Sequence, residues 1–110
     1  MSKVFFTADS HFGHGNIIKY SNRPFLTDED KKALEENGGT WQNSRHRISR
    51  DAVDLMNDTI TDNINAIVGE NDVLWHLGDF AFARREDYRR KCEFYRYRIK
   101  CQNINIVWGN

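Results

Sequence analysis

The sequence predicts a mixed α/β fold, because strand-like and helix-like segments alternate along its 110 residues. Three short segments rich in apolar, β-branched and aromatic residues, at 3–8, 72–77 and 103–108, have the composition of buried strands. Between them, apolar residues recur every three or four positions, as they do in amphipathic helices. Each strand-like segment ends in a side chain that can bind a metal ion, and this convergence is the main functional signal.

The first of these segments ends at Asp9 and His11. In open α/β sheets, ligands bind at the carboxyl ends of the strands, so we expect a carboxylate and an imidazole at that edge. The other two segments end in the same manner, in Gly78-Asp79 and in Gly109-Asn110.

A short helix is predicted at residues 16–20, directly after the first of these candidate ligand pairs. His14 precedes it, at a helix amino end where anions are favoured. The residues alone leave two roles open for His14: a solvated loop histidine or a group that faces a phosphate. Arg23 stands before Pro24 and is therefore held extended, where it forms a surface ion pair or reaches a phosphate.

Residues 27–37 predict a surface helix, with Thr27 as its cap, three acids in its first turn and glycines after its end. Residues 38–47 show no periodicity and predict a loop over the active face, anchored by Trp41. His46 lies between two arginines, which favours a structural or solvated role over metal binding.

A longer helix is predicted at residues 49–68, where one apolar stripe would pack against a sheet. The stripe consists of Ala52, Met56, Ile60, Ile64 and Ile67. His76 lies within the second strand-like segment, two residues before Gly78, and we expect it in the core or behind the metal ligands.

Residues 84–100 predict a basic helix, with eight Lys or Arg residues against three acids, a local charge of plus five. Tyr88, Cys92, Tyr95 and Ile99 fall at helical spacing and would face the core. The arginines would then lie on the outer face. Such a helix is either an ordinary solvated element or one that attracts a phosphorylated or nucleic-acid partner.

The composition is that of a soluble globular protein, since 39% of residues are hydrophobic, 29% are charged and the formal net charge is zero. No segment has the length and apolar character of a signal peptide or a membrane span, so we expect a cytoplasmic location without a membrane partner. Cys92 and Cys101 are predicted to be reduced and packed.

Together, the pairs Asp9-x-His11, Gly78-Asp79 and Gly109-Asn110 resemble the first three motifs of the calcineurin-like metallophosphoesterases, D-x-H, G-D and G-N-H. Residues 11–18, 23–25 and 76–80 also resemble a branch of small phosphoesterases from bacteria and phages. The resemblance runs from Lys3 to Asn110 and stops within the third motif. It implies that residues 1–110 are the amino-terminal part of a single domain: a partial β-sandwich flanked by helices, in the order β-α-α-β-α-β.

The resemblance also implies a role for each candidate residue. Asp9 and His11 would hold one divalent ion, Asp79 would bridge two, and Asn110 would bind the second. Gly78 and Gly109 would let the backbone turn sharply at the ligands, and His14 would lie near the substrate phosphate. The ions would be manganese, iron, zinc or nickel, with manganese expected in vitro.

The implied activity is hydrolysis of phosphate mono- or diesters, including nucleotides or nucleic acids, by a water that two metal ions activate. The histidine motifs that complete the second ion's site would follow Asn110. We therefore expect little turnover from these 110 residues unless a second chain or further residues supply those ligands. Two alternatives stay open: a non-catalytic metal-binding or regulatory module, and a nucleic-acid-binding protein that uses the basic helix.

Overall fold

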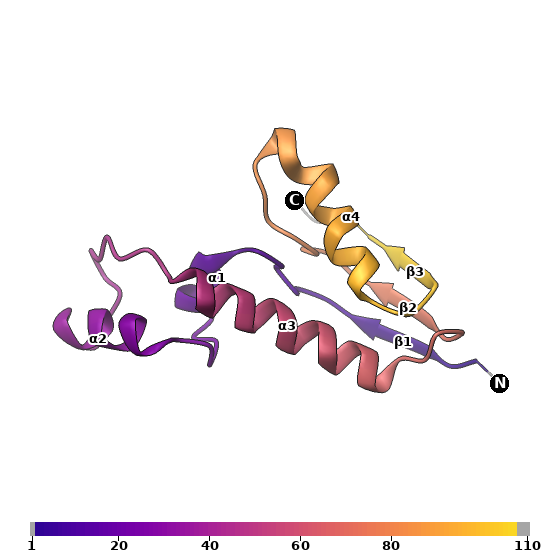
Figure 1. Ribbon diagram of the computed structural model, residues 1–110, viewed down its shortest axis with the longest axis horizontal. Helices are drawn as coiled ribbons and strands as arrows, with labels where there is room; N and C mark the ends of the chain where they lie inside the picture. Colours follow the sequence, from indigo (N-terminus) through magenta and orange to yellow (C-terminus); the bar gives the residue numbers. More distant parts are fainter. Residues whose placement is uncertain (1, 108–110) are drawn as a thin grey trace.

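The computed structural model describes residues 2–107, which form a small parallel sheet with helices packed on it (Figure 1). The elements in chain order are β1 (Val4–Thr7), α1 (Gly15–Tyr20), α2 (Asp28–Glu36), α3 (Arg50–Ile67), β2 (Val73–His76), the 3-10 turn η1 (Arg85–Asp87), α4 (Tyr88–Arg98) and β3 (Asn103–Ile106). The α/β class is confirmed. The order β-α-α-β-α-β that the resemblance implied is wrong by one helix: α1, α2 and α3 all lie between β1 and β2, where the residue patterns predict three helices.

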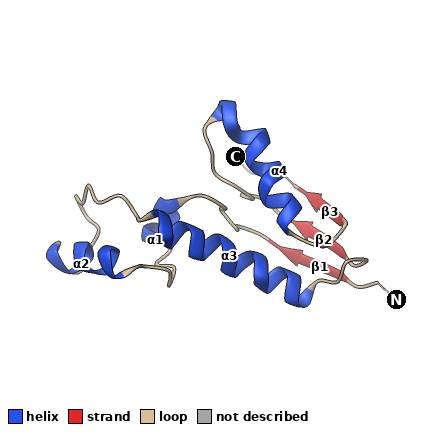
Figure 2. Cartoon of the chain, viewed as in Figure 1, coloured by secondary structure: helices blue, strands red, loops and turns tan. Residues whose placement is uncertain are grey.

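Within the described residues, one sheet has the strand order β1-β2-β3, and both neighbouring pairs are parallel. Val73 of β2 lies opposite Val4 of β1 and Asn103 of β3. The connections between strands contain α3 and α4, which lie alongside the sheet (Figure 2). Since all strands run in the same direction, their carboxyl ends meet at one edge, as the sequence predicts.

Both long helices cover the same face of this sheet. Leu74 is buried there, and Phe5, Ile104 and Ile106 pack around it. The helices contribute Ile60, Ile64 and Val68 from α3 and its end, and Cys92, Tyr95 and Ile99 from α4 and its end. Residues outside the helices and strands complete the cluster: Phe12, Phe80, Ala81 and Cys101. On the opposite face, Val4, Phe6 and Trp75 are 56%, 67% and 38% exposed. One face of the sheet is therefore covered and the other is open.

Helix α3 lies where it was predicted, but its apolar stripe packs differently from the prediction at both ends. Ser49 caps it by accepting a hydrogen bond from the backbone N–H of Ala52. Ala52 and Met56 are buried, but in a second cluster with Ile18 and Ile48 instead of against the sheet. The prediction that Ile67 belongs to the buried stripe is wrong, since this side chain is 67% exposed. The helix ends at this point, and the next residue, Val68, enters the core instead of Ile67.

Helix α4 turns its predicted face to the core, since Cys92, Tyr95 and Ile99 are all buried. Tyr88, at the first position, is 36% exposed. Cys92 and Cys101 are buried free thiols, as predicted. Among the described helices, none combines the length and the apolar character that crossing a bilayer requires.

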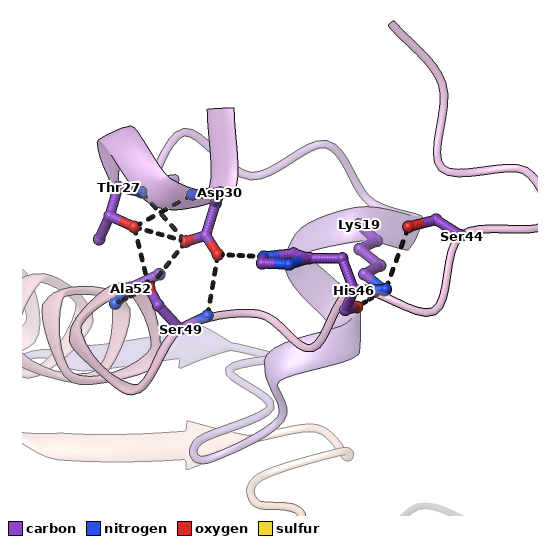
Figure 3. Close-up of polar contacts among 7 residues, drawn as sticks. All are labelled: Lys19, Thr27, Asp30, Ser44, His46, Ser49 and Ala52. Carbon is purple, nitrogen blue, oxygen red and sulfur yellow. Dashed lines mark hydrogen bonds and ion pairs between the residues drawn. The ribbon is translucent and has the colours of Figure 1, made fainter. Parts of the chain in front are cut away.

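Helix α2 was predicted to be a surface element, and that prediction is wrong at one residue. Thr27 caps the helix through reciprocal hydrogen bonds with Asp30, as in a capping box. Asp30 is fully buried and also accepts hydrogen bonds from Ser49, through the backbone N–H at 2.9 Å and the hydroxyl at 2.7 Å. Figure 3 shows that this carboxylate joins the start of α2 to the start of α3.

His46 completes this polar cluster, so the structural role predicted for it is confirmed. Its Nε2 lies 2.7 Å from Asp30 Oδ1, and its backbone oxygen accepts a hydrogen bond from Lys19 Nζ. The imidazole stacks on Trp41, which packs against the second apolar cluster. Burial would raise the pKa of Asp30, but hydrogen bonds from His46, Ser49 and Thr27 outweigh it and hold that pKa far below its ordinary value.

Replacing this carboxylate should destabilise the fold strongly. We expect Asp30→Asn to lower the free energy of unfolding by about 1.5–3 kcal/mol, because the amide cannot accept all the hydrogen bonds that His46, Ser49 and Thr27 donate to the buried carboxylate. Asp28→Asn, in the same helical turn but exposed, should cost less than about 1 kcal/mol. Urea denaturation of both variants checks this, and equal costs would contradict the role of Asp30.

The same carboxylate should make stability depend on acid. Because the pKa of Asp30 is lowered on folding, its contribution is complete above its ordinary value of 3.8 and declines as the pH falls below that value. The difference in unfolding free energy between the unmodified chain and Asp30→Asn should therefore be constant near neutral pH and shrink in acid. Denaturation at a series of pH values measures it; a difference independent of pH would contradict the assignment.

Candidate functional site

Two loops meet at the carboxyl edge of the sheet, and the backbone pairs them as if the strands continued. In the loop after β1, the backbone N–H of Asp9 donates a hydrogen bond to Gly78 O at 3.0 Å, and that of His11 donates one to Asp79 O at 2.9 Å. Phe12 N then donates to Phe80 O at 3.0 Å. These bonds join residues that lie far apart in the sequence, and they fix the register of the loops that carry the candidate ligands.

This pairing brings Asp9, His11 and Asp79 together. One ligand atom of each residue lies within 4.8 Å of the others, and His11 Nε2 is 3.9 Å from Asp79 Oδ2. Metal–ligand bonds of about 2.0–2.2 Å allow ligand atoms to be at most about 4.4 Å apart. Side-chain movements of a few tenths of an ångström would therefore suffice for one ion. Two carboxylates and an imidazole suit divalent ions such as manganese, iron, zinc or nickel.

All three residues have backbone conformations in the left-handed region, with φ of 55° at Asp9, 51° at His11 and 50° at Asp79. Residues other than glycine adopt this region rarely, and such conformations gather at functional sites. Gly78, just before Asp79, has φ of 118°, which only glycine adopts readily. The sharp turn predicted at Gly78 is therefore confirmed. Gly109 lies outside the described residues.

Arg23 holds the first of these loops in place. Its guanidinium donates to the backbone oxygen of Ser10 at 2.9 Å and to that of Asp9 at 2.6 Å. Instead of the surface ion pair that was one expectation for it, Arg23 contacts these carbonyl groups and Met56 Sδ at 3.3 Å. The sequence carries no signal for this role, because backbone acceptors are not visible in a residue pattern.

The buried side chains of Ser10 and His76 link the two loops by hydrogen bonds. The Ser10 hydroxyl donates to Phe80 O at 2.6 Å, so it accepts the hydrogen bond from His76 Nε2 at 2.9 Å. His76 is 1% exposed, which confirms its predicted place in the core, behind the candidate ligands. Burial lowers the pKa of His76 against the opposing effect of Asp9 and Asp79, which favours the neutral imidazole.

His14 lies beside the cluster of candidate ligands, as predicted, at the N-cap position of α1, where its side chain makes no capping hydrogen bond. Its ring is 5.6 Å from the ring of His11 and stacks on Phe82 at 4.2 Å. Burial, His11 and Arg23 lower the pKa of His14, so its imidazole is neutral at neutral pH. His14 Nδ1 is buried, with no hydrogen-bond partner in the part of the chain that the structure describes.

A pocket of about 960 Å³ opens on the other side of His14. His14, Phe82 and Tyr95 line it, together with a wall formed by residues 47–54 at and before the start of α3, of which all but Ala52 contribute. Gly13 lies on the boundary, where an added Cβ would come within 2.7 Å of the Tyr95 hydroxyl. The polar cluster around Asp30 fixes the wall formed by residues 47–54, because Ser49 belongs to both.

The predicted second-ion ligand, Asn110, lies outside the described residues. The strand before it, β3, is parallel to β2 and ends at the same edge of the sheet. Within residues 2–107, the candidate ligands that gather at this edge are Asp9, His11 and Asp79.

The basic segment at 84–100 has its arginines largely in ion pairs. Arg84 and Arg90 pair with Asp87, and Arg89 pairs with Glu93. Arg98 pairs with Asp58 of α3. These ion pairs are mostly exposed, and most of their acidic partners belong to the same segment. Such pairs are typical of an ordinary solvated helix.

Comparisons with known proteins leave the family open. No family model matches the chain. The chain is similar to an uncharacterized protein of Methanocaldococcus jannaschii, with 30% identity over 86 residues, which cover 78% of this chain and 35% of that relative. The chain thus spans about a third of the length of the curated relative it matches. No solved structure matches it.

Removing the Ser10 hydroxyl should loosen the pairing of the two loops. We expect Ser10→Ala to lower the free energy of unfolding by about 1–3 kcal/mol, because His76 Nε2 and Phe80 O would lose a buried partner. Ser21→Ala, at an exposed position, should change it by less than about 0.5 kcal/mol. Urea denaturation measures both, and equal stabilities would show that Ser10 does not join the loops.

Proposed function

We propose that this chain carries the first metal site of a metal-dependent phosphoesterase. The observation that supports this most is the meeting of Asp9, His11 and Asp79 at the carboxyl edge of a parallel sheet, each in a left-handed backbone conformation. The same residues carry the resemblance to the calcineurin-like metallophosphoesterases. Geometry and resemblance thus lead independently to one set of side chains.

In this proposal, Asp9 and His11 would hold one ion, and Asp79 would contribute to the sites of both ions. Bound divalent ions would neutralise the oxygens of a phosphate ester and lower the pKa of the attacking water. Ser10 and His76 keep the two ligand loops at a fixed separation, and Arg23 holds the first loop. The neutral imidazole of His14 would hydrogen-bond the substrate phosphate from the side of the pocket.

The open face of the sheet supports the proposed sandwich architecture. Parallel sheets are usually covered on both faces, yet Val4, Phe6 and Trp75 are exposed on one face. In a metallophosphoesterase sandwich, a second sheet would pack against these side chains. The described residues would then be one of its two layers, with α3 and α4 on the outside.

Catalysis by two ions needs more ligands than the described residues bring together. Asp9, His11 and Asp79 suffice for one ion, so the second would depend on Asn110, on further residues or on a second chain. We therefore propose that the 110-residue chain binds one divalent ion and turns over slowly. The arginine pairs of residues 84–100 make a nucleic-acid-binding module the weaker alternative.

The metal site predicts the effect of removing one carboxylate. Asp79→Asn should lower the affinity for Mn²⁺ at least about tenfold, because an amide is a weaker ligand than a carboxylate. Isothermal titration calorimetry with Mn²⁺ measures this. Asp62→Asn, an exposed acid on α3, should leave the affinity unchanged.

Hydrolysis of bis(p-nitrophenyl) phosphate with added Mn²⁺ then tests the chemistry. The rate, although low, should fall in Asp79→Asn and stay the same in Asp62→Asn. Stoichiometric Mn²⁺ binding without any turnover, even at high metal concentration, would favour the non-catalytic module. Equal affinities and equal rates in both variants would overturn the proposed site.

A further inference from the structure

Phe82 presents an open aromatic surface beside the candidate metal site. It follows Asp79 by three residues, and its backbone N–H donates to Phe12 O at 2.8 Å, which fixes the ring's position relative to the ligand loops. One face of the ring stacks on His14, with an angle of 13° between the planes. The side chain is nevertheless 57% exposed, so the surface turned away from His14 faces solvent.

The charges in the adjoining pocket are balanced. Three basic side chains line it, Arg47, Arg50 and Lys91, against the acids Glu29, Asp51 and Asp54. None of these six forms an ion pair with another described residue. A pocket lined by equal numbers of positively and negatively charged side chains does not select a second phosphate. It suits an uncharged polar group, and the amide of Asn16 on its wall offers both a donor and an acceptor.

The spacing of the rings fits a ligand with two different ends. His11 belongs to the metal cluster, and its ring centroid is 5.6 Å from that of His14. Phe82 stacks on one face of His14 with the ring centroids 4.2 Å apart, so the His14 ring separates the open face of Phe82 from His11. A phosphate at the metal cluster and an aromatic ring on Phe82 would therefore be separated by a linker, as a ribose separates the phosphate of a nucleotide from its base. An aryl phosphate, whose ring is bonded directly to the phosphate oxygen, would hold the ring too close to the metal cluster.

We propose that the site binds a nucleoside monophosphate, with its base stacked on Phe82 and its phosphate at Asp9, His11 and Asp79. For the position of the phosphate, this inference rests on the proposed function. For the position of the base, it rests on Phe82 and the pocket alone. Base–aromatic stacking tolerates any base, so the inference concerns the class of ligand and not the identity of the base.

The test compares two ligands that differ only by the base. With Mn²⁺ present, AMP should bind the unmodified chain more tightly than ribose 5-phosphate, and Phe82→Leu should remove most of that difference. The expected loss for AMP is about 5- to 100-fold, the contribution of one stacked base, while the affinity for ribose 5-phosphate changes much less. Phe94→Leu is the matched control, since Phe94 is also 57% exposed but lies on α4 outside the pocket.

The outcomes separate this inference from the proposed function. Equal, Mn²⁺-dependent binding of AMP and ribose 5-phosphate would overturn the base site and leave the phosphoesterase proposal standing. Phenyl phosphate binding as tightly as AMP would also overturn it. A chain that binds neither Mn²⁺ nor either sugar phosphate would overturn both. The comparison in the unmodified chain decides the question even if Phe82→Leu does not fold.

Discussion

The backbone pairing of the two loops beyond β1 and β2 is the constraint on which the candidate site depends. Two parallel strands bring their carboxyl ends to one edge, but strands alone would let the following loops diverge. Hydrogen bonds from Asp9 and His11 to Gly78 and Asp79 prolong the pairing past the strand ends. Because the ligands belong to this paired region, their separation is set by backbone geometry and not by flexible side chains.

That geometry has a conformational cost, which the surrounding residues offset. Left-handed backbone at a residue other than glycine costs about 1–2 kcal/mol, and Asp9, His11 and Asp79 all adopt it. A hydrogen bond from a charged group contributes about 1.5–3 kcal/mol, and Arg23 makes two to the carbonyl oxygens of this region. The bonds of Ser10 with His76 and Phe80 add to this support. The ligand positions are therefore held before any ion binds, which is the preorganisation that a metal site requires.

The polar cluster around Asp30 has a comparable role on the other side of the pocket. A buried carboxylate with five donors fixes the start of α3 relative to α2 and to the loop that carries His46. The wall formed by residues 47–54 is therefore held in place within the pocket that Phe82 also lines. One buried ionic cluster and one pair of hydrogen-bonded loops thus define the two sides of the space where a substrate would lie.

The sequence by itself determined the α/β class, the strand ends, the caps of α2 and α3 and three of the candidate ligands. These features follow from local rules: the periodicity of apolar residues, the preference of Thr27 and Ser49 for helix starts, and the tendency of parallel strands to end at one edge. Only the tertiary structure decided that Asp30 is buried, that Ile67 is exposed, that Arg23 binds backbone carbonyls and that Phe82 stacks on His14. Each of these depends on a partner far away in the sequence or on the direction in which the chain leaves a helix, and neither is encoded in the spacing of neighbouring residues.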